Sequence, residues 1–211
     1  MTPISPPNRG RADCTVGVQR VQKREFMQQL ASPAQLRAAI ARWALVTVPL
    51  CLGLGFVSAS AAGSVPDNAW FAMLDKPALY PAPIVFPIVW SILYVLMGVA
   101  LAQVCAARGA RGRLVAALAF AGQLALNLAW SPVFFAMHRM TVALGIIVAL
   151  IVVLGLTIAL FWRVRRGAAM LLLPYMAWVC FASLLNWQFI AANPGMDGVA
   201  GPRAMIRMQL P

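Results

Sequence analysis

Charged residues divide the chain into long uncharged runs that are rich in apolar residues. Five such runs occur: 43–66, 77–107, 114–138, 140–162 and 167–196. Each is longer than the roughly 20 residues that a helix needs to cross the hydrocarbon core of a bilayer. The apolar residues within them do not alternate with a period of two, as the roughly ten-residue strands of a membrane barrel would. The pattern therefore predicts an all-α integral membrane protein, a bundle of five transmembrane helices.

The composition supports this prediction and excludes two other classes of protein. Of the 211 residues, 62% are apolar and only 10% are charged, which excludes a disordered or fibrous chain. The net charge of +12 accompanies a strongly positive mean hydropathy, so a soluble nucleic-acid binder is also excluded, and the expected partner is the lipid bilayer.

Basic residues near the predicted helix ends gather on one side of the bundle. That side carries Arg37, Arg42, Arg108, Arg111, Arg113, Arg163, Arg165 and Arg166, and the opposite side carries Lys76, Arg139, Arg203 and Arg207. Because cytoplasmic loops carry an excess of Lys and Arg, we expect the amino terminus in the cytoplasm and the carboxyl terminus outside. Few lysines and many Ala and Arg residues indicate a GC-rich bacterial source, and hence the inner membrane.

The expected domain organisation is simple. Residues 1–40 form a basic, disordered or membrane-surface extension, 41–193 the five-helix membrane domain and 194–211 a short tail. Met27 is an alternative start. The stretch 37–61 also imitates a cleaved signal peptide, and cleavage would leave four helices.

The third predicted helix has two distinct faces. Small residues recur every four positions on one face, at Ala117, Ala121, Ala125 and Ala129. The other face carries Gln123, Asn127, Trp130 and Phe134. A small-residue stripe permits close helix packing, either within the bundle or in a homodimer, and Gly55, Ala59 and Gly63 repeat the motif in the first helix.

Aromatic residues at helical spacing favour an internal pocket. Trp90, Tyr94 and Met97 share one face of the second helix, and Trp178, Ala182, Leu185 and Phe189 share one face of the fifth, with Asn186 beside it. If these faces converge with that of Asn127, they enclose a ring-lined pocket for a flat apolar ligand; the alternative is ordinary core packing with amide groups joining helices. We expect Pro49, Pro87, Pro132 and Pro174 to bend their helices.

The sequence offers little conventional reaction chemistry. All five acidic residues lie outside the predicted spans, which counts against a proton-coupled carrier. The single histidine, His138, is expected at the interface and solvated. The four cysteines lie far apart, so neither a metal cluster nor a disulfide framework is expected, and no cofactor is required.

Four strings resemble one known family in the right order. They are WFAMLDKP at 70–77, FPIVWSILYVLMG at 86–98, QLALNLAWSPVFF at 123–135 and PYMAWVCFASLLN at 174–186. Together they are similar to the tryptophan-rich sensory protein / translocator protein family (TspO/MBR), over about residues 43–193.

The resemblance implies a five-helix membrane protein, often dimeric, that binds porphyrins, haem-related tetrapyrroles, sterols and synthetic aromatic ligands. It implies a pocket inside the bundle, covered by a lid at residues 66–83. Trp90 and Trp178 match two family tryptophans implicated in ligand binding and in light-dependent porphyrin breakdown. The other matching pocket positions are Tyr94, Asn127, Phe134, Ala182 and Leu185.

The chain departs from the family pattern at two places. Ala78 and Leu79 stand where members usually have one or two tryptophans, which removes aromatic surface for stacking. The sterol motif of animal members needs a Tyr followed by a basic residue, and 185–189 has neither.

The resemblance favours a membrane receptor or sensor that captures a tetrapyrrole and regulates its handling or a downstream response. In this reading Asn127 orients a polar edge, and Lys76 or Arg139 meets a propionate at the mouth. The alternatives are an enzyme that degrades protoporphyrin through Trp90 and Trp178, and a transporter of porphyrins or lipids.

Overall fold

The computed structural model describes residues 33–63 and 68–199, whose regular structure is helical. The helices are α2 (Pro33–Ala61), α3 (Ala69–Met73), α4 (Val85–Ala106), α5 (Arg113–Ser131), the π-helical turn η2 (Pro132–Ala136), α6 (Met140–Val164), α7 (Arg166–Leu171) and α8 (Leu173–Ala192). Five helical segments are long and apolar enough to cross a membrane, which confirms the predicted five-span bundle. The predictions for Met27 and for most of the 1–40 extension lie outside the described residues.

The chain divides into two compact units, Met1–Ala39 and Ile40–Pro211. Of the first unit, residues 33–39 are described and are helical, as the beginning of α2. The second unit holds the remainder of α2 and every later helix of the described residues.

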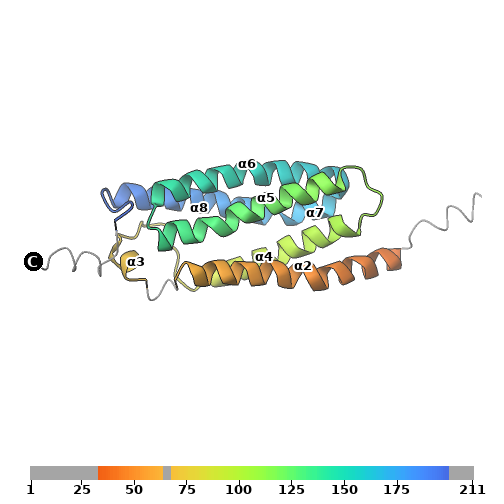
Figure 1. The fold of residues 1–211 in the computed structure, drawn as a ribbon, viewed down its shortest axis with the longest axis horizontal. Coiled ribbons are helices and arrows are strands. Elements are labelled where there is room, and N and C mark those ends of the chain that lie inside the picture. Colours follow the sequence, from red (N-terminus) through yellow and green to blue (C-terminus); the bar gives the residue numbers. More distant parts are fainter. Residues whose placement is uncertain (1–32, 64–67, 200–211) are drawn as a thin grey trace, which may run out of the picture. The chain divides into compact units, whose positions relative to one another are not determined.

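Short connections make successive long helices of the second unit antiparallel (Figure 1). The ends of α4 and α6 and the beginnings of α5 and α7 therefore lie at one end of the unit, with Arg108, Arg111, Arg113, Arg163, Arg165 and Arg166. The opposite end holds α3, Lys76 and Arg139. This separation of basic residues agrees with the sequence pattern, while the orientation in the membrane stays a prediction.

Two helix boundaries differ from the uncharged runs. The helix expected from residue 43 begins at Pro33, because the arginines at positions 37 and 42 have long side chains that a helix accommodates while their charged ends reach water. The second helix begins at Val85, although its uncharged run begins at 77. The prolines at 77, 81 and 83 lack the N–H groups of a helical ladder, so this apolar stretch is a connection.

The expectation that four prolines bend helices is wrong for Pro87, which lies in the first turn of α4, where a missing N–H costs no helical hydrogen bond. Pro174 lies in the first turn of α8, directly after a break in the fifth span. Pro49 lies inside α2, and Pro132 begins η2. The fifth span is interrupted at Leu172, between α7 and α8, two residues before Pro174.

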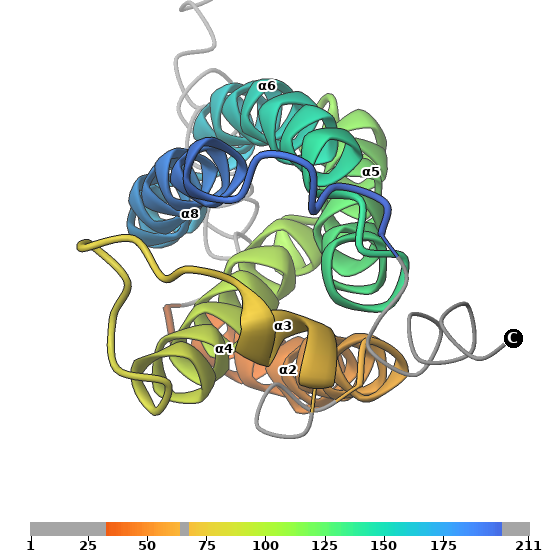
Figure 2. The same ribbon diagram turned by 90° about the vertical axis from the view of Figure 1, so that its left-hand side faces the viewer.

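The helices surround an apolar core, and α3 lies across one end of the unit (Figure 2). Helix α2 packs through Thr47, whose Oγ donates a hydrogen bond to the Gly98 carbonyl oxygen at 2.7 Å. A Cβ at Gly98 would lie 2.6 Å from the Cα of Val48, so only glycine allows α2 and α4 to cross this closely. Higher along α2, Ser58 Oγ donates to the Leu128 carbonyl oxygen of α5 at 2.6 Å.

Candidate ligand-binding site

A cavity of about 750 Å³ lies between the helices, next to the end covered by α3. Its wall contains the seven positions that match the family pocket: Trp90, Tyr94, Asn127, Phe134, Trp178, Ala182 and Leu185. They come from α4, α5, η2 and α8, so the three helical faces converge here, which their spacing alone had left open; Met97 shares the face of Trp90 but does not line the cavity. That these residues bind a ligand stays a prediction.

The π-helical turn η2 decides how two rings enter the wall. Pro132, at the beginning of this turn, has no N–H to donate. The Met137 N–H donates to the carbonyl oxygen of Pro132, five residues back, at 2.9 Å, which is the hydrogen bond of a π-helix. The wider turn brings both Phe134 and Phe135 to the cavity, with their centroids 4.9 Å apart. Trp130 stacks on Phe134 at 5.2 Å, so the α5 side of the cavity is a continuous ring surface.

The few polar side chains in the wall are largely engaged with each other. Tyr94 Oη donates to Asn127 Oδ1 at 2.8 Å. Trp130 Nε1 donates to Asn186 Oδ1 at 3.1 Å, and Asn186 Nδ2 donates to the Met140 carbonyl oxygen at 3.0 Å. Asn186 thus joins α5, α6 and α8, as amides in membrane helices commonly do. The Asn127 amide is engaged by Tyr94 and also interacts with the hydroxyl of Tyr175, so a ligand would share this amide with two tyrosines.

Trp178 differs from these groups because its Nε1 is buried without a hydrogen-bond partner among the described residues. A buried indole N–H normally finds an acceptor. Here the ring is held by Phe86 and Phe181, with centroid distances of 6.0 and 5.4 Å. The Trp178 N–H is therefore an unsatisfied buried donor in a side chain that lines the cavity.

Gln123 does not belong to the site, although its spacing places it on the face of Asn127. Its side chain is fully buried, both amide atoms lack a partner among the described residues, and it does not line the cavity. It lies one helical turn from Asn127, away from the end at which the cavity lies. Helical spacing fixes a face but not a depth, which is why the sequence grouped the two residues.

The described part of the expected lid, 68–83, closes the cavity with aromatic side chains. Phe71, Tyr80 and Phe86 line the wall together with Phe189 of α8. Phe71 lies 5.5 Å and Tyr80 5.7 Å from Phe189, centroid to centroid. The sequence analysis did not assign Phe71 and Tyr80 to the site, because their contacts join segments more than 100 residues apart and no helical period connects them.

Hydrogen bonds fasten this lid to the bundle at two places. The Asp75 N–H donates to Asn193 Oδ1 at 2.7 Å, and Asn193 Nδ2 donates back to the Asp75 carbonyl oxygen at 3.0 Å. The Asn68 side chain accepts from the Phe71 N–H at 2.9 Å and donates to the Phe135 carbonyl oxygen at 3.0 Å. Lys76 forms its hydrogen bonds within the lid.

Lys76 lines the cavity mouth but is engaged with the backbone. Its Nζ donates to the carbonyl oxygens of Phe71, Ala72 and Leu74 at 2.6, 3.0 and 2.8 Å. Burial lowers the pKa of Lys76, and the neighbouring Asp75 partly offsets this. All three ammonium donors stabilise the carboxyl end of α3, so the expected contact with a propionate would have to displace one. Arg139 is exposed and does not line the cavity.

His138 is half-buried and stacks on the lid instead of being fully solvated. Its ring lies 4.5 Å from the ring of Trp70, at an interplanar angle of 23°. Its backbone has a φ of 58°, and its carbonyl oxygen accepts from the Gly198 N–H at 2.7 Å. Burial lowers the pKa of His138, against a smaller rise from a backbone hydrogen bond to Val199. No pattern in the sequence indicated that His138 would reach Trp70.

The two small-residue stripes lie in different surroundings. Ala121, Ala125 and Ala129 of α5 are exposed, so that face is open to lipid or to a second copy of the chain. In α2 the stripe is divided, because Gly55 is buried against Tyr94 whereas Ala59 and Gly63 are exposed. The homodimer stays a prediction. Among the described residues, His, Cys, Asp and Glu form no group of three that would hold a metal ion.

Comparison with known proteins agrees with this architecture. A model of the TspO/MBR family matches residues 45–191, which include every predicted site residue. "Tryptophan-rich protein TspO" of Chlorobaculum tepidum is 39% identical over 155 residues, covering 71% of this chain and 98% of that protein. "Protein CrtK" of Rhodobacter capsulatus is 35% identical, over 66% of this chain and 91% of that protein. The human "Translocator protein" is 35% identical, over 61% of this chain and 78% of that protein.

Proposed function

Because the chain belongs to the TspO/MBR family and is an integral multi-pass membrane protein, we propose that it is a receptor for a flat, largely apolar ligand of the tetrapyrrole class. The ligand occupies the cavity inside the bundle. Its binding regulates the handling of the ligand or a downstream response, as the sensory and translocator names of its relatives suggest.

The ring-lined cavity is the observation that carries this proposal. Its volume of about 750 Å³ falls in the range of small-molecule sites, which are typically apolar with a few oriented polar groups. Trp90 and Trp178 are half-buried in the wall and offer rings for stacking on a macrocycle, and the Trp178 N–H is a donor without a partner among the described residues. A flat aromatic ligand can use both features. A polar solute would find few hydrogen-bond partners in this wall and would lose its hydration without compensation.

The cavity wall contains aromatic side chains although positions 78 and 79 carry no tryptophan. Ala78 and Leu79 are exposed and do not line the cavity. Phe71 and Tyr80 supply the aromatic surface of the lid, and Phe86 at the beginning of α4 adds a third ring beside them. The proposal therefore expects stacking on these three rings in place of the usual tryptophans.

A titration of protoporphyrin IX into the purified full chain in lipid nanodiscs tests the proposal. We expect saturable quenching of tryptophan fluorescence at about one ligand per chain. Trp178→Phe removes the free indole donor and should weaken binding about tenfold, since a hydrogen bond is worth about 1 kcal/mol or somewhat more. Trp187→Phe, an exposed position on the same helix, is the matched control and should bind normally. Quenching that never saturates would contradict the proposal.

Degradation of the bound porphyrin is a second candidate, supported by a row of oxidisable rings. Trp90 lies 5.5 Å from Tyr94 and 6.3 Å from Tyr175, centroid to centroid. The same titration under light distinguishes the two functions. Loss of the porphyrin absorbance bands faster than for free porphyrin, and slower in Trp90→Phe at equal occupancy, would identify an enzyme. If free and bound porphyrin lose their absorbance at equal rates, the protein binds the porphyrin but does not degrade it.

A further inference from the structure

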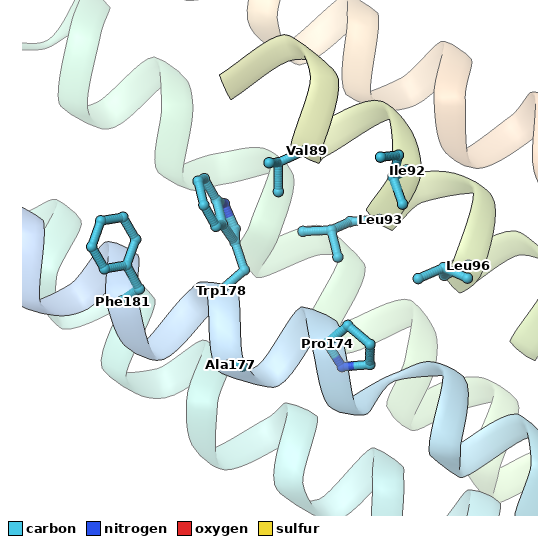
Figure 3. A pocket seen from close by; sticks show the side chains of 8 residues that line it. All are labelled: Val89, Ile92, Leu93, Leu96, Pro174, Ala177, Trp178 and Phe181. Atoms are coloured by element: carbon cyan, nitrogen blue, oxygen red, sulfur yellow. The ribbon is translucent and has the colours of Figure 1, made fainter. Parts of the chain in front are cut away.

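A second hollow lies on the outer surface of the bundle, between α4 and α8. It measures about 460 Å³ and is lined by side chains of these two helices only (Figure 3). Val89 and Ile92 of α4 face Ala177 and Trp178 of α8 across it. All its side chains are aliphatic or aromatic, and both helices lie in the predicted spans, so the groove opens toward the hydrocarbon of the bilayer.

Trp178 separates this groove from the inner cavity. Among the described residues it alone lines both hollows. Its indole N–H has no hydrogen-bond partner among the described residues, and apolar packing against the core and the ring contacts with Phe86 and Phe181 hold it in place. Because no hydrogen bond has to break, a change of the Trp178 side-chain rotamer is the smallest rearrangement that would connect the groove with the cavity.

The other boundaries of the cavity are fastened more strongly. The lid is held to the bundle by the two hydrogen bonds between Asp75 and Asn193 and by the one that Asn68 Nδ2 donates to the Phe135 carbonyl oxygen. On the opposite flank of α4, Tyr94 lies against Gly55 and is hydrogen-bonded to Asn127. Opening either of these boundaries breaks part-buried hydrogen bonds, each at a cost of about 1 kcal/mol.

We propose that the groove between α4 and α8 is a lateral portal, through which a flat apolar ligand passes between the bilayer and the inner cavity, with the Trp178 indole as its gate. This inference rests on the proposed function, because it concerns the path of the same ligand. An apolar ligand is concentrated in the hydrocarbon core, where the groove lies, and needs no passage through water to reach it.

The test fills the groove without touching the cavity. Ala177 is exposed in the groove and does not line the cavity, so Ala177→Trp obstructs the path while leaving the bound state intact. In proteoliposomes loaded with protoporphyrin IX, stopped-flow energy transfer from tryptophan should show association and dissociation both slowed about tenfold, the effect of about 1.4 kcal/mol on the barrier. The Kd should be unchanged. Leu184→Trp, an exposed position of α8 outside the groove, is the control and should exchange normally.

Two further variants distinguish the competing paths. Asn193→Ala loosens the lid, and under this proposal it leaves both rate constants unchanged; faster exchange would identify the lid as the path and overturn the proposal. Ala59→Trp adds bulk on the α2 flank of the cavity. Slower exchange in Ala59→Trp together with normal exchange in Ala177→Trp would also overturn it. An absence of saturable binding in the unsubstituted protein contradicts the proposed function itself, whereas normal rates in Ala177→Trp at an intact Kd contradict only the portal.

Discussion

Gly55 determines how Tyr94 sits in the cavity wall. A Cβ at this position would overlap the Tyr94 ring, whose hydroxyl is hydrogen-bonded to Asn127. We expect Gly55→Ala to displace the ring and break that bond, lowering the free energy of unfolding by about 1–3 kcal/mol, as overpacked cores do. Thermal unfolding in detergent and the protoporphyrin Kd would both report the change.

Gly53 provides the matched control on the same helix. A Cβ there meets nothing within 4 Å. Gly53→Ala should therefore leave the melting temperature and the Kd unchanged or slightly improved, since alanine favours the helix. Equal losses in the two variants would show that a general effect on α2, and not the contact with Tyr94, explains the result.

Protonation of His138 is expected to make the stability of the folded chain depend on pH. Burial lowers its pKa from the ordinary value of 6.5, so the folded chain holds the neutral imidazole more strongly than the unfolded chain does. The stability gained in this way is complete above the unfolded pKa and is lost as the pH falls from there through the lowered folded pKa. We expect the melting temperature to fall between about pH 7 and about pH 5. His138→Asn, which tolerates the positive φ, should remove this step; an unchanged pH profile would show that another group titrates.

At the scale of elements, the lid depends on one side chain at the end of α8. Asn193 makes both hydrogen bonds with Asp75 across 118 residues of sequence. We expect Asn193→Ala to speed amide hydrogen exchange of the segment around Asp75 about tenfold, the effect of about 1.4 kcal/mol on local opening. Peptides from α6 should exchange as before. Protection that is unchanged around Asp75 would show that the aromatic cluster alone holds the lid.

The sequence predicted the long elements better than their ends. Five spans follow from hydrophobicity and length, which bilayer thickness makes decisive. The uncharged run that begins at residue 77 overstated its helix by the stretch before Val85, because absence of charge does not measure helix formation where prolines are frequent. The π-helical turn at Pro132 was also not predicted, although it brings Phe134 and Phe135 into one wall.

For the site, too, the sequence predicted residues that share one helix better than contacts between distant segments. Residues that share a helical face, such as Trp178, Ala182 and Leu185, were grouped correctly on the cavity wall from spacing and family resemblance. The clamp from Asn193 to Asp75 was not predicted, because it joins loop ends whose positions only the folded bundle fixes. Periodicity describes one helix at a time, whereas the closure of this cavity depends on contacts between segments.

At the scale of the whole molecule, the distribution of charge predicts the orientation. Basic loops at 107–112 and around Arg165 lie at one end of the second unit, and the lid lies at the other. Translocation of loops rich in arginine is disfavoured, so we expect the lid and the cavity mouth to lie outside the cytoplasm. The end of α8, which is fastened to the lid through Asn193 and Asp75, is then expected on the same side as the lid.

Cysteine labelling in intact bacterial cells tests this orientation. With the four native cysteines replaced by alanine, Ala78→Cys in the exposed lid should react with a membrane-impermeant maleimide. Ala110→Cys in the opposite loop should react only after the cells are permeabilised. The reverse pattern would place the cavity mouth in the cytoplasm, and a lateral portal would then receive its ligand from the same hydrocarbon core, because the α4–α8 groove faces lipid in either orientation.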